Sequence, residues 1–251
     1  MSETKKTITA AVLVIGDEIL SGRTKDKNIG YIADFCTNVG IDLAEVRIVP
    51  DVEDEIVAAV NALRARYTYV FTTGGIGPTH DDITADAIAR AFGVGISENP
   101  EVIEMLLTRI KREDLNEARR RMARIPHGAR LVKNRVSTAP GFWIGNVIVM
   151  AGVPSIMQSM MDAVADKLET GARMIIENID AGGIPEGGYA AGLGEIAAAH
   201  AELSIGSYPS FLDGKFRNQI VVRGKDADAV ATGVARVEAL LKDLRAARTG
   251  G

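Results

Sequence analysis

The first half of the chain alternates two kinds of hydrophobic pattern. Short, almost uninterrupted apolar runs predict strands buried on both faces, as in a parallel sheet. Between them, apolar residues recur every three or four positions, which is the spacing of an amphipathic helix. The elements expected in chain order are a strand at Ile8–Ile15, a helix at Lys25–Val39, a strand at Ile41–Val49, a helix at Glu53–Arg66, a strand at Thr68–Thr73 and a helix at Ile83–Phe92.

The second half begins with a charged segment, Pro100–Arg124, for which we expect a longer helical stretch. An apolar strand at Asn146–Met150 and a helix at Ser155–Leu168 follow. The glycines between Gly182 and Gly194 predict a loop or linker. The other elements expected after Gly171 are a strand at Arg173–Ile179, a helix at Glu195–Leu203, strands at Ile205–Phe211 and Arg217–Arg223, and a helix at Ala227–Arg245.

These patterns predict two domains. Residues 1–170 are expected to form an α/β three-layer sandwich around a mostly parallel sheet, because strands and helices alternate. Residues 171–251 are expected to form a small α+β domain with the element order β-α-β-β-α. The boundary is placed near Gly171, where the composition changes.

Composition narrows the class of protein. The 251 residues carry a formal net charge of −4, and this mild acidity argues against a dedicated nucleic-acid-binding protein. The longest apolar run, Ile8–Ile15, is far shorter than the roughly 20 residues of a membrane span, and no signal-peptide pattern is evident. Cys36 has no second cysteine to pair with. We therefore expect a cytoplasmic protein that binds neither nucleic acid nor membrane.

Carboxylates follow three of the expected parallel strands. Glu18 follows the first strand, Asp51 the second and Asp82 the third. Because the carboxyl ends of parallel strands share one edge of the sheet, where open α/β folds bind ligands, these acids are expected to meet. Their mutual repulsion favours a cation such as Mg²⁺, which prefers carboxylate and phosphate oxygens. The alternative is that Asp51 and Asp82 cap helices and Glu18 is a solvated loop residue.

The third strand ends in a glycine-rich loop, Thr72–Thr79, with the sequence TTGGIGPT. Its glycines allow main-chain N–H groups to form an anion-binding nest, and the N-terminus of the following helix adds a positive dipole end. The loop is not a P-loop, because it has no lysine, and His80 breaks the dinucleotide-binding glycine pattern. The hydroxyl groups expected to donate to phosphate oxygens are those of Thr72, Thr73, Thr79 and Thr84.

Gly16–Gly22 with Asn28, and the motif TTGGIGPTHDDIT at Thr72–Thr84, resemble the molybdopterin-binding (MoaB/Mog-type) domain. The resemblance is closer to its competence/damage-inducible protein A branch. Full-length relatives of that branch carry a further C-terminal domain that hydrolyses an amide of nicotinamide mononucleotide. We expect this chain to lack that domain, because 251 residues leave no room for it. Further matches are Asn134, Thr138–Phe142, Gly152–Pro154 and Ile205–Pro209.

The resemblance implies a site for a phosphorylated nucleotide or a pterin, and a homo-oligomeric assembly. It implies that Glu18, Asp51 and Asp82 are catalytic and bind a divalent metal, Mg²⁺, Mn²⁺ or Co²⁺. Residues that depart from the family pattern are expected to reshape the pocket wall; they are Ser137, Ala151 and Ile156. The residues expected to bind substrate are Ser21, Asn28, Thr73, Gly74, Gly75, Gly77, Pro78, Thr79, Asp81 and Thr84.

Two functions remain open at this point. The first is a metal-dependent hydrolase, in which a metal-bound water attacks the pyrophosphate of a molecule such as ADP-ribose or FAD, held by Gly74–Thr79. The second is a non-hydrolytic protein that binds molybdopterin or a nucleotide and is linked to molybdenum cofactor biosynthesis. The arginines between Arg109 and Arg124 form a solvated or oligomer-contacting face, or else supply a guanidinium group to the phosphates.

Overall fold

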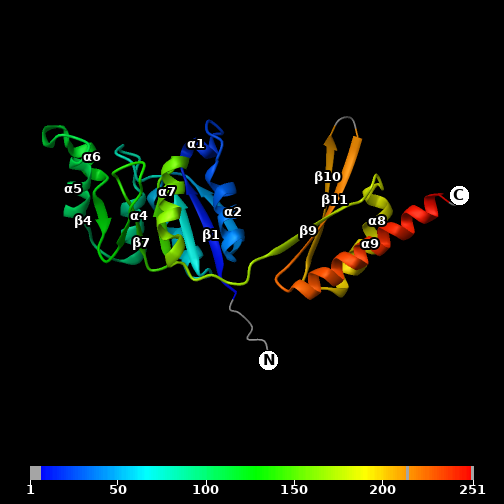
Figure 1. Ribbon diagram of the computed structural model, residues 1–251. Helices are drawn as coiled ribbons and strands as arrows, with labels where there is room; N and C mark the ends of the chain where they lie inside the picture. The colour runs from blue at the N-terminus through cyan, green and yellow to red at the C-terminus, as the bar shows by residue number, and fades with distance from the viewer. Residues whose placement is uncertain (1–6, 213–214, 250–251) are drawn as a thin grey trace, which may run out of the picture. The chain divides into compact units, whose positions relative to one another are not determined.

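The computed structural model describes residues 7–212 and 215–249. The chain divides into two compact units, Met1–Gly171 and Ala172–Gly251. Each unit has a hydrophobic core of its own. Figure 1 traces the elements along the chain in colour.

A six-stranded sheet forms the centre of the first unit. Its strands are β1 (Thr9–Ile15), β2 (Asp42–Val49), β3 (Tyr69–Thr73), β6 (Arg130–Val132), β7 (Gly141–Ile144) and β8 (Val147–Met150). They lie in the order β2-β1-β3-β8-β7-β6. The first four in this order run parallel, and the last two continue the sheet in antiparallel pairing.

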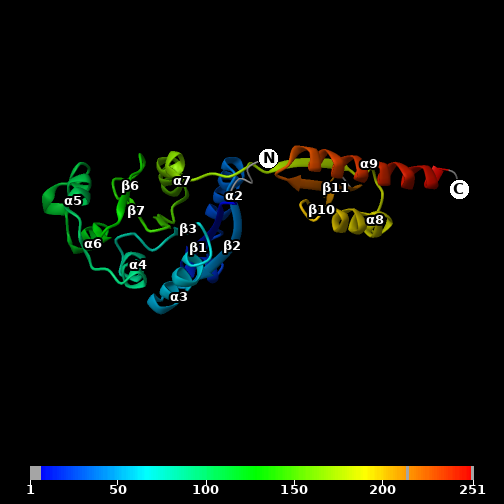
Figure 2. The ribbon, with the colours of Figure 1, turned by 90° about the horizontal axis from the view of Figure 1, so that it is seen from below.

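Helices cover both faces of this sheet (Figure 2). On one face lie α2 (Asn28–Val39) and α7 (Pro154–Val164). On the other lie α3 (Glu53–Arg64) and α4 (Thr84–Phe92). The predicted three-layer α/β sandwich with a mostly parallel sheet is therefore confirmed.

The two apolar layers are built by alternation along the buried strands. Val12 packs in the layer that contains Ile32 of α2, whereas the next residue, Leu13, packs in the layer that contains Ile56 of α3. Both residues of β1 are fully buried. A strand covered on both faces needs apolar side chains at every position, which is why it appears as a continuous apolar run.

The expectation of one long helical stretch at Pro100–Arg124 is wrong. Asn116 divides the segment, because its side chain accepts a hydrogen bond from the Arg119 N–H and caps a separate helix. The segment contains α5 (Pro100–Leu107), a 3₁₀ turn η1 (Arg112–Asp114) and α6 (Glu117–Arg121), and ends where β5 (Arg124–Pro126) pairs with β4 (Ile96–Glu98).

The antiparallel strands β6 and β7 were not among the predicted elements. They are three and four residues long, too short for a period to be visible. Gly141 in β7 allows a close approach to β8, because a Cβ there would lie 2.1 Å from the Val149 carbonyl oxygen. Such a contact is a property of the folded sheet and leaves no local pattern in the sequence.

The second unit is the small α+β domain that the sequence predicts, and its order β-α-β-β-α is confirmed. Its elements are β9 (Ile175–Asp180), α8 (Glu186–Ala199), β10 (Ser204–Leu212), β11 (Lys215–Gly224) and α9 (Ala227–Thr249). The three strands pair antiparallel in the order β10-β11-β9. No helix in residues 7–212 and 215–249 combines the length and the apolar content that crossing a membrane requires.

The glycine-rich segment Gly182–Gly194 is largely helical, so the predicted loop is wrong and the following helix begins earlier than Glu195. The glycines serve helix packing: a Cβ on Gly192 would lie 2.7 Å from Leu240 of α9. Tyr189 is buried within the core of this unit. Tertiary contact therefore overrides the weak helix propensity of glycine.

Phe71→Ala is expected to reduce the free energy of unfolding of the first unit by about 3–5 kcal/mol, because Phe71 is fully buried between two strands and its loss leaves a cavity. Urea unfolding followed by tryptophan fluorescence measures this change, since Trp143 is the only tryptophan and lies in the same core layer. Tyr208→Ala, at an exposed position of the second unit, is the control. A loss below about 1 kcal/mol for Phe71→Ala would contradict this packing.

Candidate functional site

Three loops meet closely where β1, β3 and β8 end. A Cβ on Gly74 would lie 2.1 Å from the carbonyl oxygen of Ile15, and a Cβ on Gly152 would lie 3.3 Å from the Gly74 Cα. Gly74 also has a φ of +103°, a conformation that favours glycine. A side chain at Gly74 would therefore separate the first two loops, and one at Gly152 would press tightly on the third contact.

The carboxylate of Asp82 shapes the glycine loop from within. One oxygen accepts a hydrogen bond from the Gly77 N–H at 2.7 Å. The other accepts from the Thr79 N–H at 2.8 Å and from the Thr79 hydroxyl at 2.5 Å. Charge-assisted hydrogen bonds of this kind are about twice as strong as neutral ones, so Asp82 holds the loop in its turn.

Thr84, at the start of α4, ties the loop to the helix. Its hydroxyl donates to the carbonyl oxygen of Gly74 at 3.0 Å, and its N–H donates to the carbonyl oxygen of Gly75 at 3.0 Å. A Cβ on Gly75 would lie 2.1 Å from that hydroxyl oxygen. The glycine loop is thus anchored at both ends before any ligand binds.

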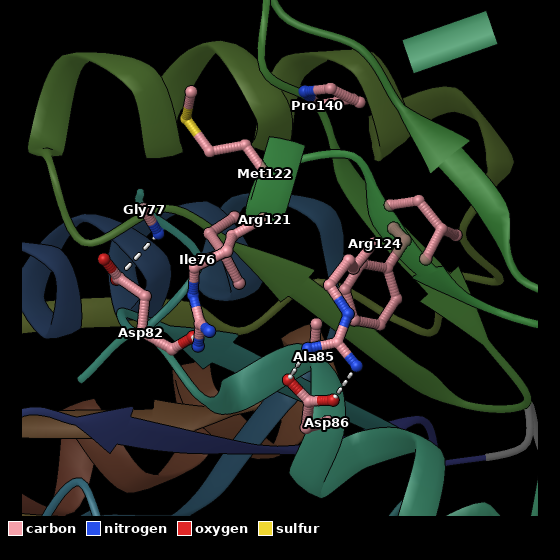
Figure 3. A pocket seen from close by; sticks show the side chains of 12 residues that line it. Ile76, Gly77, Asp82, Ala85, Asp86, Arg121, Met122, Arg124 and Pro140 are labelled. Carbon is pink, nitrogen blue, oxygen red and sulfur yellow. Dashed lines mark hydrogen bonds and ion pairs between the residues drawn. The ribbon is translucent and has the colours of Figure 1, made fainter. Parts of the chain in front are cut away.

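Two arginines lie beside the glycine loop and α4, where they line a small pocket (Figure 3). Arg121 donates from Nη2 to the carbonyl oxygen of Asp82 at 3.2 Å. Arg124 binds the carboxylate of Asp86 in a two-point contact, with 2.9 Å from Nη1 to Oδ2 and 2.6 Å from Nη2 to Oδ1. Neither arginine lines the larger cavity described next.

A cavity of about 540 Å³ lies over the glycine loop. This volume is within the range of small-molecule sites, roughly 300–1,000 Å³. Glycine-loop residues Gly74–Pro78 and the acids Glu18 and Asp82 form part of its lining. The remaining lining residues are Thr24, Met122, Ser137, Ala139, Ala151–Pro154 and Ile156.

The three residues that depart from the family pattern, Ser137, Ala151 and Ile156, all line this cavity. They therefore lie where the sequence places them, and that they reshape the pocket wall stays a prediction. Ile156 makes this part of the wall apolar, which suits contact with a ring system.

A second cavity of about 230 Å³ adjoins the first and shares Glu18, Gly74 and Gly152 with it. Two of its lining residues, Asn28 and Thr73, are only 4% and 1% exposed. Asn28 donates from Nδ2 to the Gly152 carbonyl oxygen at 2.8 Å. Its Oδ1 and the Thr73 Oγ1 have no hydrogen-bond partner in residues 7–212 and 215–249. Each such buried atom costs about 1–3 kcal/mol unless a bound molecule satisfies it.

Main-chain donors also remain available at the larger cavity. Five N–H groups among its lining residues have no hydrogen-bond partner in the described parts of the chain. One belongs to Glu18 at the start of α1, and the other four belong to Gly75, Ile76, Gly152 and Val153. Val153 is the N-cap of the 11-residue helix α7 and makes no side-chain cap hydrogen bond. The positive end of this helix dipole therefore reinforces the donors beside the glycine loop.

The carboxylate of Asp51 lies next to the short helix α1 (Asp17–Leu20), where its Oδ2 accepts from the Asp17 N–H at 3.0 Å. Burial raises the pKa of Asp51 above its ordinary value, and the nearby charges of Asp17, Glu18 and Asp81 raise it further, against the lowering effect of that hydrogen bond. The acids at the first two strand ends are therefore close enough to interact. Glu18 has no hydrogen-bond or ion-pair partner for its carboxylate among the residues that the structure describes.

The predicted metal ligands do not fit a preformed metal centre. Within the described ranges, no group of three or more His, Cys, Asp or Glu side chains is arranged to hold a metal ion. The carboxylate oxygens of Asp82 are occupied by the loop, and Asp51 lines neither cavity. The divalent metal thus stays a prediction from the family resemblance.

The other predicted site residues divide into three groups. Those lining a cavity are Asn28, Thr73, Gly74, Gly75, Gly77 and Pro78. Thr79 and Thr84 line neither and act on the loop itself. Ser21 and Asp81 are exposed and outside both linings, and the Ser21 hydroxyl donates to the Glu18 carbonyl oxygen at 3.3 Å. Sequence reasoning missed Thr24, which lies between the motif residues Gly22 and Asn28, and Met122, whose neighbours in the sequence carry no motif.

Family models match most of this chain. Residues 11–170 match the model described as "probable molybdopterin binding domain". Residues 181–248 match the model described as "FAD synthase, middle domain". The first match covers the unit that contains both cavities.

Individual relatives agree with these matches. A protein of Archaeoglobus fulgidus is 33% identical over 236 residues, which is 93% of this chain and 98% of that protein. A probable FAD synthase of Caenorhabditis briggsae is 30% identical over 248 residues, and the match spans 47% of that protein. The crystal structure of CinA from Thermoplasma acidophilum, a protein of unknown function, has a TM-score of 0.61 and 33% identity, covering 64% of this chain and 98% of that one.

The chain therefore belongs to the molybdopterin-binding domain family. Within it, the chain is a MoaB/Mog-type protein that resembles CinA, the branch that its motifs predict.

Asp51→Asn is expected to stabilise the protein more at neutral pH than in acid. A carboxyl whose pKa is raised by folding contributes less to stability as the pH rises above its ordinary value of 3.8, because the folded state holds the proton more tightly than the unfolded state. Asparagine does not ionise, so the variant does not undergo this decrease in stability with rising pH. Urea unfolding at about pH 4 and about pH 7 should show a gap over wild type that widens toward pH 7. A gap that widens toward pH 4 would contradict the burial of Asp51.

Proposed function

We propose that the first unit binds a phosphorylated nucleotide or pterin, with phosphate oxygens against the glycine loop and the ring system along the apolar wall. The observation that carries this proposal is the set of unpartnered main-chain N–H groups of Gly75, Ile76, Gly152 and Val153 around one cavity. Converging main-chain donors at a helix N-terminus are typical of anion sites.

The carboxylate of Asp82 does not oppose this assignment. The Asp82 carboxylate accepts hydrogen bonds from Gly77 and Thr79, and so it orders the loop against which the phosphate would bind. The apolar wall includes Met122 and Ile156, which offer contact surface to a planar ring. The adjoining cavity extends the site toward Thr73, where the ligand would satisfy a buried hydroxyl.

Thr73→Val is expected to weaken binding of ADP-ribose about 5- to 30-fold while leaving the protein as stable as wild type or more so, because valine removes a buried hydroxyl that has no partner until the ligand arrives. Thr72→Val is the matched control. Thr72 is the neighbouring residue of β3, is fully buried with an equally unpartnered hydroxyl, and lines neither cavity.

Isothermal titration calorimetry of both variants with ADP-ribose, FAD and inorganic pyrophosphate measures the affinities. Equal losses of affinity in Thr73→Val and Thr72→Val would show that the ligand does not bind in the adjoining cavity. Absence of binding for all three compounds to the wild type would overturn the proposed ligand class.

A second candidate function is hydrolysis of the pyrophosphate of an ADP-ribose- or FAD-like molecule. It is favoured by Glu18, whose unpartnered carboxylate lines both cavities. The similarity to a probable FAD synthase supports a nucleotide ligand but does not bear on hydrolysis. In this reaction water attacks a phosphorus atom, the bridging P–O bond breaks, two phosphate monoesters form, and Glu18 accepts the proton of the water. A divalent cofactor, if used, would need phosphate oxygens among its ligands, because the described acids do not form a set of three.

Glu18→Gln tests this candidate. If Glu18 is the general base, kcat for AMP release from ADP-ribose or FAD should fall by about 100-fold or more, with KM little changed. The assay is run with Mg²⁺, Mn²⁺ and Co²⁺ in turn. Tight ligand binding without AMP release under any of these ions would favour the non-hydrolytic function.

A further inference from the structure

Met160 of α7 is fully buried and lines neither cavity, yet its sulfur contacts the main chain of the candidate site. Its Sδ accepts a hydrogen bond from the Ala151 N–H at 3.4 Å. Ala151 begins the loop 151–153, which follows β8 and supplies the N–H groups of Gly152 and Val153 to the larger cavity. We propose that Met160 is a positioning residue that orients these two donors toward a bound phosphate. This inference rests on the proposed function, because it concerns the donors that would hold the ligand.

The ladder of β7 and β8 ends before Ala151 and leaves its N–H to a side chain. The Met150 carbonyl oxygen accepts a hydrogen bond from the Gly74 N–H at 3.1 Å, so the main-chain groups of Met150 point toward β3. Because successive residues of a strand point to opposite edges, the Ala151 N–H points to the side of β7. Continuing the register of β7 and β8 would place Pro140 opposite Ala151, but the described ladder ends two residues earlier. The Met160 sulfur therefore takes the place of a carbonyl acceptor.

A glycine in the neighbouring strand makes room for the sulfur. A Cβ on Gly141, the first residue of β7, would lie 3.2 Å from the Met160 Sδ and 2.1 Å from the Val149 carbonyl oxygen. The sulfur thus lies against the bare main chain of Gly141, within reach of the end of β8. A thioether is a weak acceptor on a flexible, unbranched side chain, which suits an irregular position beyond the end of a ladder.

The peptide groups at both ends of the loop are fixed. The peptide between Met150 and Ala151 is held on one side by the Gly74 N–H and on the other by the Met160 sulfur. The Gly152 carbonyl oxygen accepts from the Asn28 Nδ2 at 2.8 Å.

These two anchors constrain the donors between them. Because the C=O and N–H of a trans peptide point in opposite directions, the Val153 N–H points away from Asn28. The Gly152 N–H belongs to the peptide that lies between the two fixed ones. Met160 therefore acts on the ligand only through the orientation of the loop, as a positioning residue does.

Met160→Leu removes the acceptor while keeping the core filled. Leucine and methionine have similar volumes, and exchanges between them are well tolerated in cores. The Ala151 N–H then has no partner, and the first peptide of the loop is no longer held on both sides. The expected result is weaker phosphate binding in a protein that keeps its fold.

Isothermal titration calorimetry with inorganic pyrophosphate measures this effect. Met160→Leu should raise the dissociation constant about 3- to 10-fold, which corresponds to the loss of one hydrogen bond. Met161→Leu is the matched control and should bind as the wild type does. Met161 is the next residue of α7, is equally buried and lines neither cavity, and its sulfur makes no hydrogen bond within residues 7–212 and 215–249.

Amide NMR spectroscopy of the ligand-free chain tests the hydrogen bond itself. In Met160→Leu the Ala151 amide resonance should move upfield, and those of Gly152 and Val153 should shift with it. Met161→Leu should leave all three resonances in place. A general loss of stability would not select these three amides, so the spectrum separates positioning from a purely structural role.

The two measurements distinguish this inference from the proposed function. A wild type that binds neither pyrophosphate nor ADP-ribose contradicts the proposed function, and the role of Met160 in binding is overturned with it. A wild type that binds, with equal affinities of the two leucine variants or an unchanged Ala151 resonance in Met160→Leu, overturns the positioning role alone.

If Met160→Leu does not fold, the wild-type spectrum decides. An Ala151 amide shift with the small temperature dependence of a hydrogen-bonded amide supports the proposal. A temperature dependence equal to that of a solvent-exposed amide overturns it.

Discussion

The hydrogen bonds of one carboxylate, Asp82, determine the conformation on which the candidate site depends. The carboxylate accepts hydrogen bonds from the N–H groups of Gly77 and Thr79. The turn that these hydrogen bonds stabilise places Gly75 and Ile76 in the lining of the cavity. The same loop packs against Ile15 at a distance that only Gly74 permits. Asp82, which the sequence suggests as a metal ligand, is thus a carboxylate that binds the protein's own loop. By ordering the loop, it leaves the neighbouring main-chain N–H groups available to a bound phosphate.

The alternation of strands and helices in the first unit could be predicted because each parallel strand is buried on both faces. Residues such as Val12 and Leu13 must both be apolar, and this requirement is visible without the fold. The helix α8 could not be predicted in the same way. Its glycines indicate a loop locally, and only the approach of Leu240 to Gly192 explains why they are helical. The segment Pro100–Arg124 is divided because Asn116 caps the start of a separate helix, α6. The many charged residues around Asn116 made this cap hard to recognise in the sequence.

In the candidate site, too, some features could be predicted from the sequence and others could not. Its location at the carboxyl edge followed from the parallel sheet, and the glycine loop with Asn28 and Thr73 lies at the two cavities as expected. The roles of individual groups did not follow, because whether a carboxylate faces outward or into its own loop is decided by a few main-chain torsions. Met122 enters the site from a distant segment, and no spacing rule connects it to the loop.

Amide NMR spectroscopy of the chain titrated with ADP-ribose tests the central claim most directly. A phosphate bound by the main-chain donors shifts the amide resonances of the residues that supply them, while Gly77 and Thr79, already bonded to Asp82, shift less. The account predicts the largest changes at Gly75, Ile76, Gly152 and Val153. Saturable binding that leaves these four resonances in place, or that shifts only residues of the second unit, would contradict it.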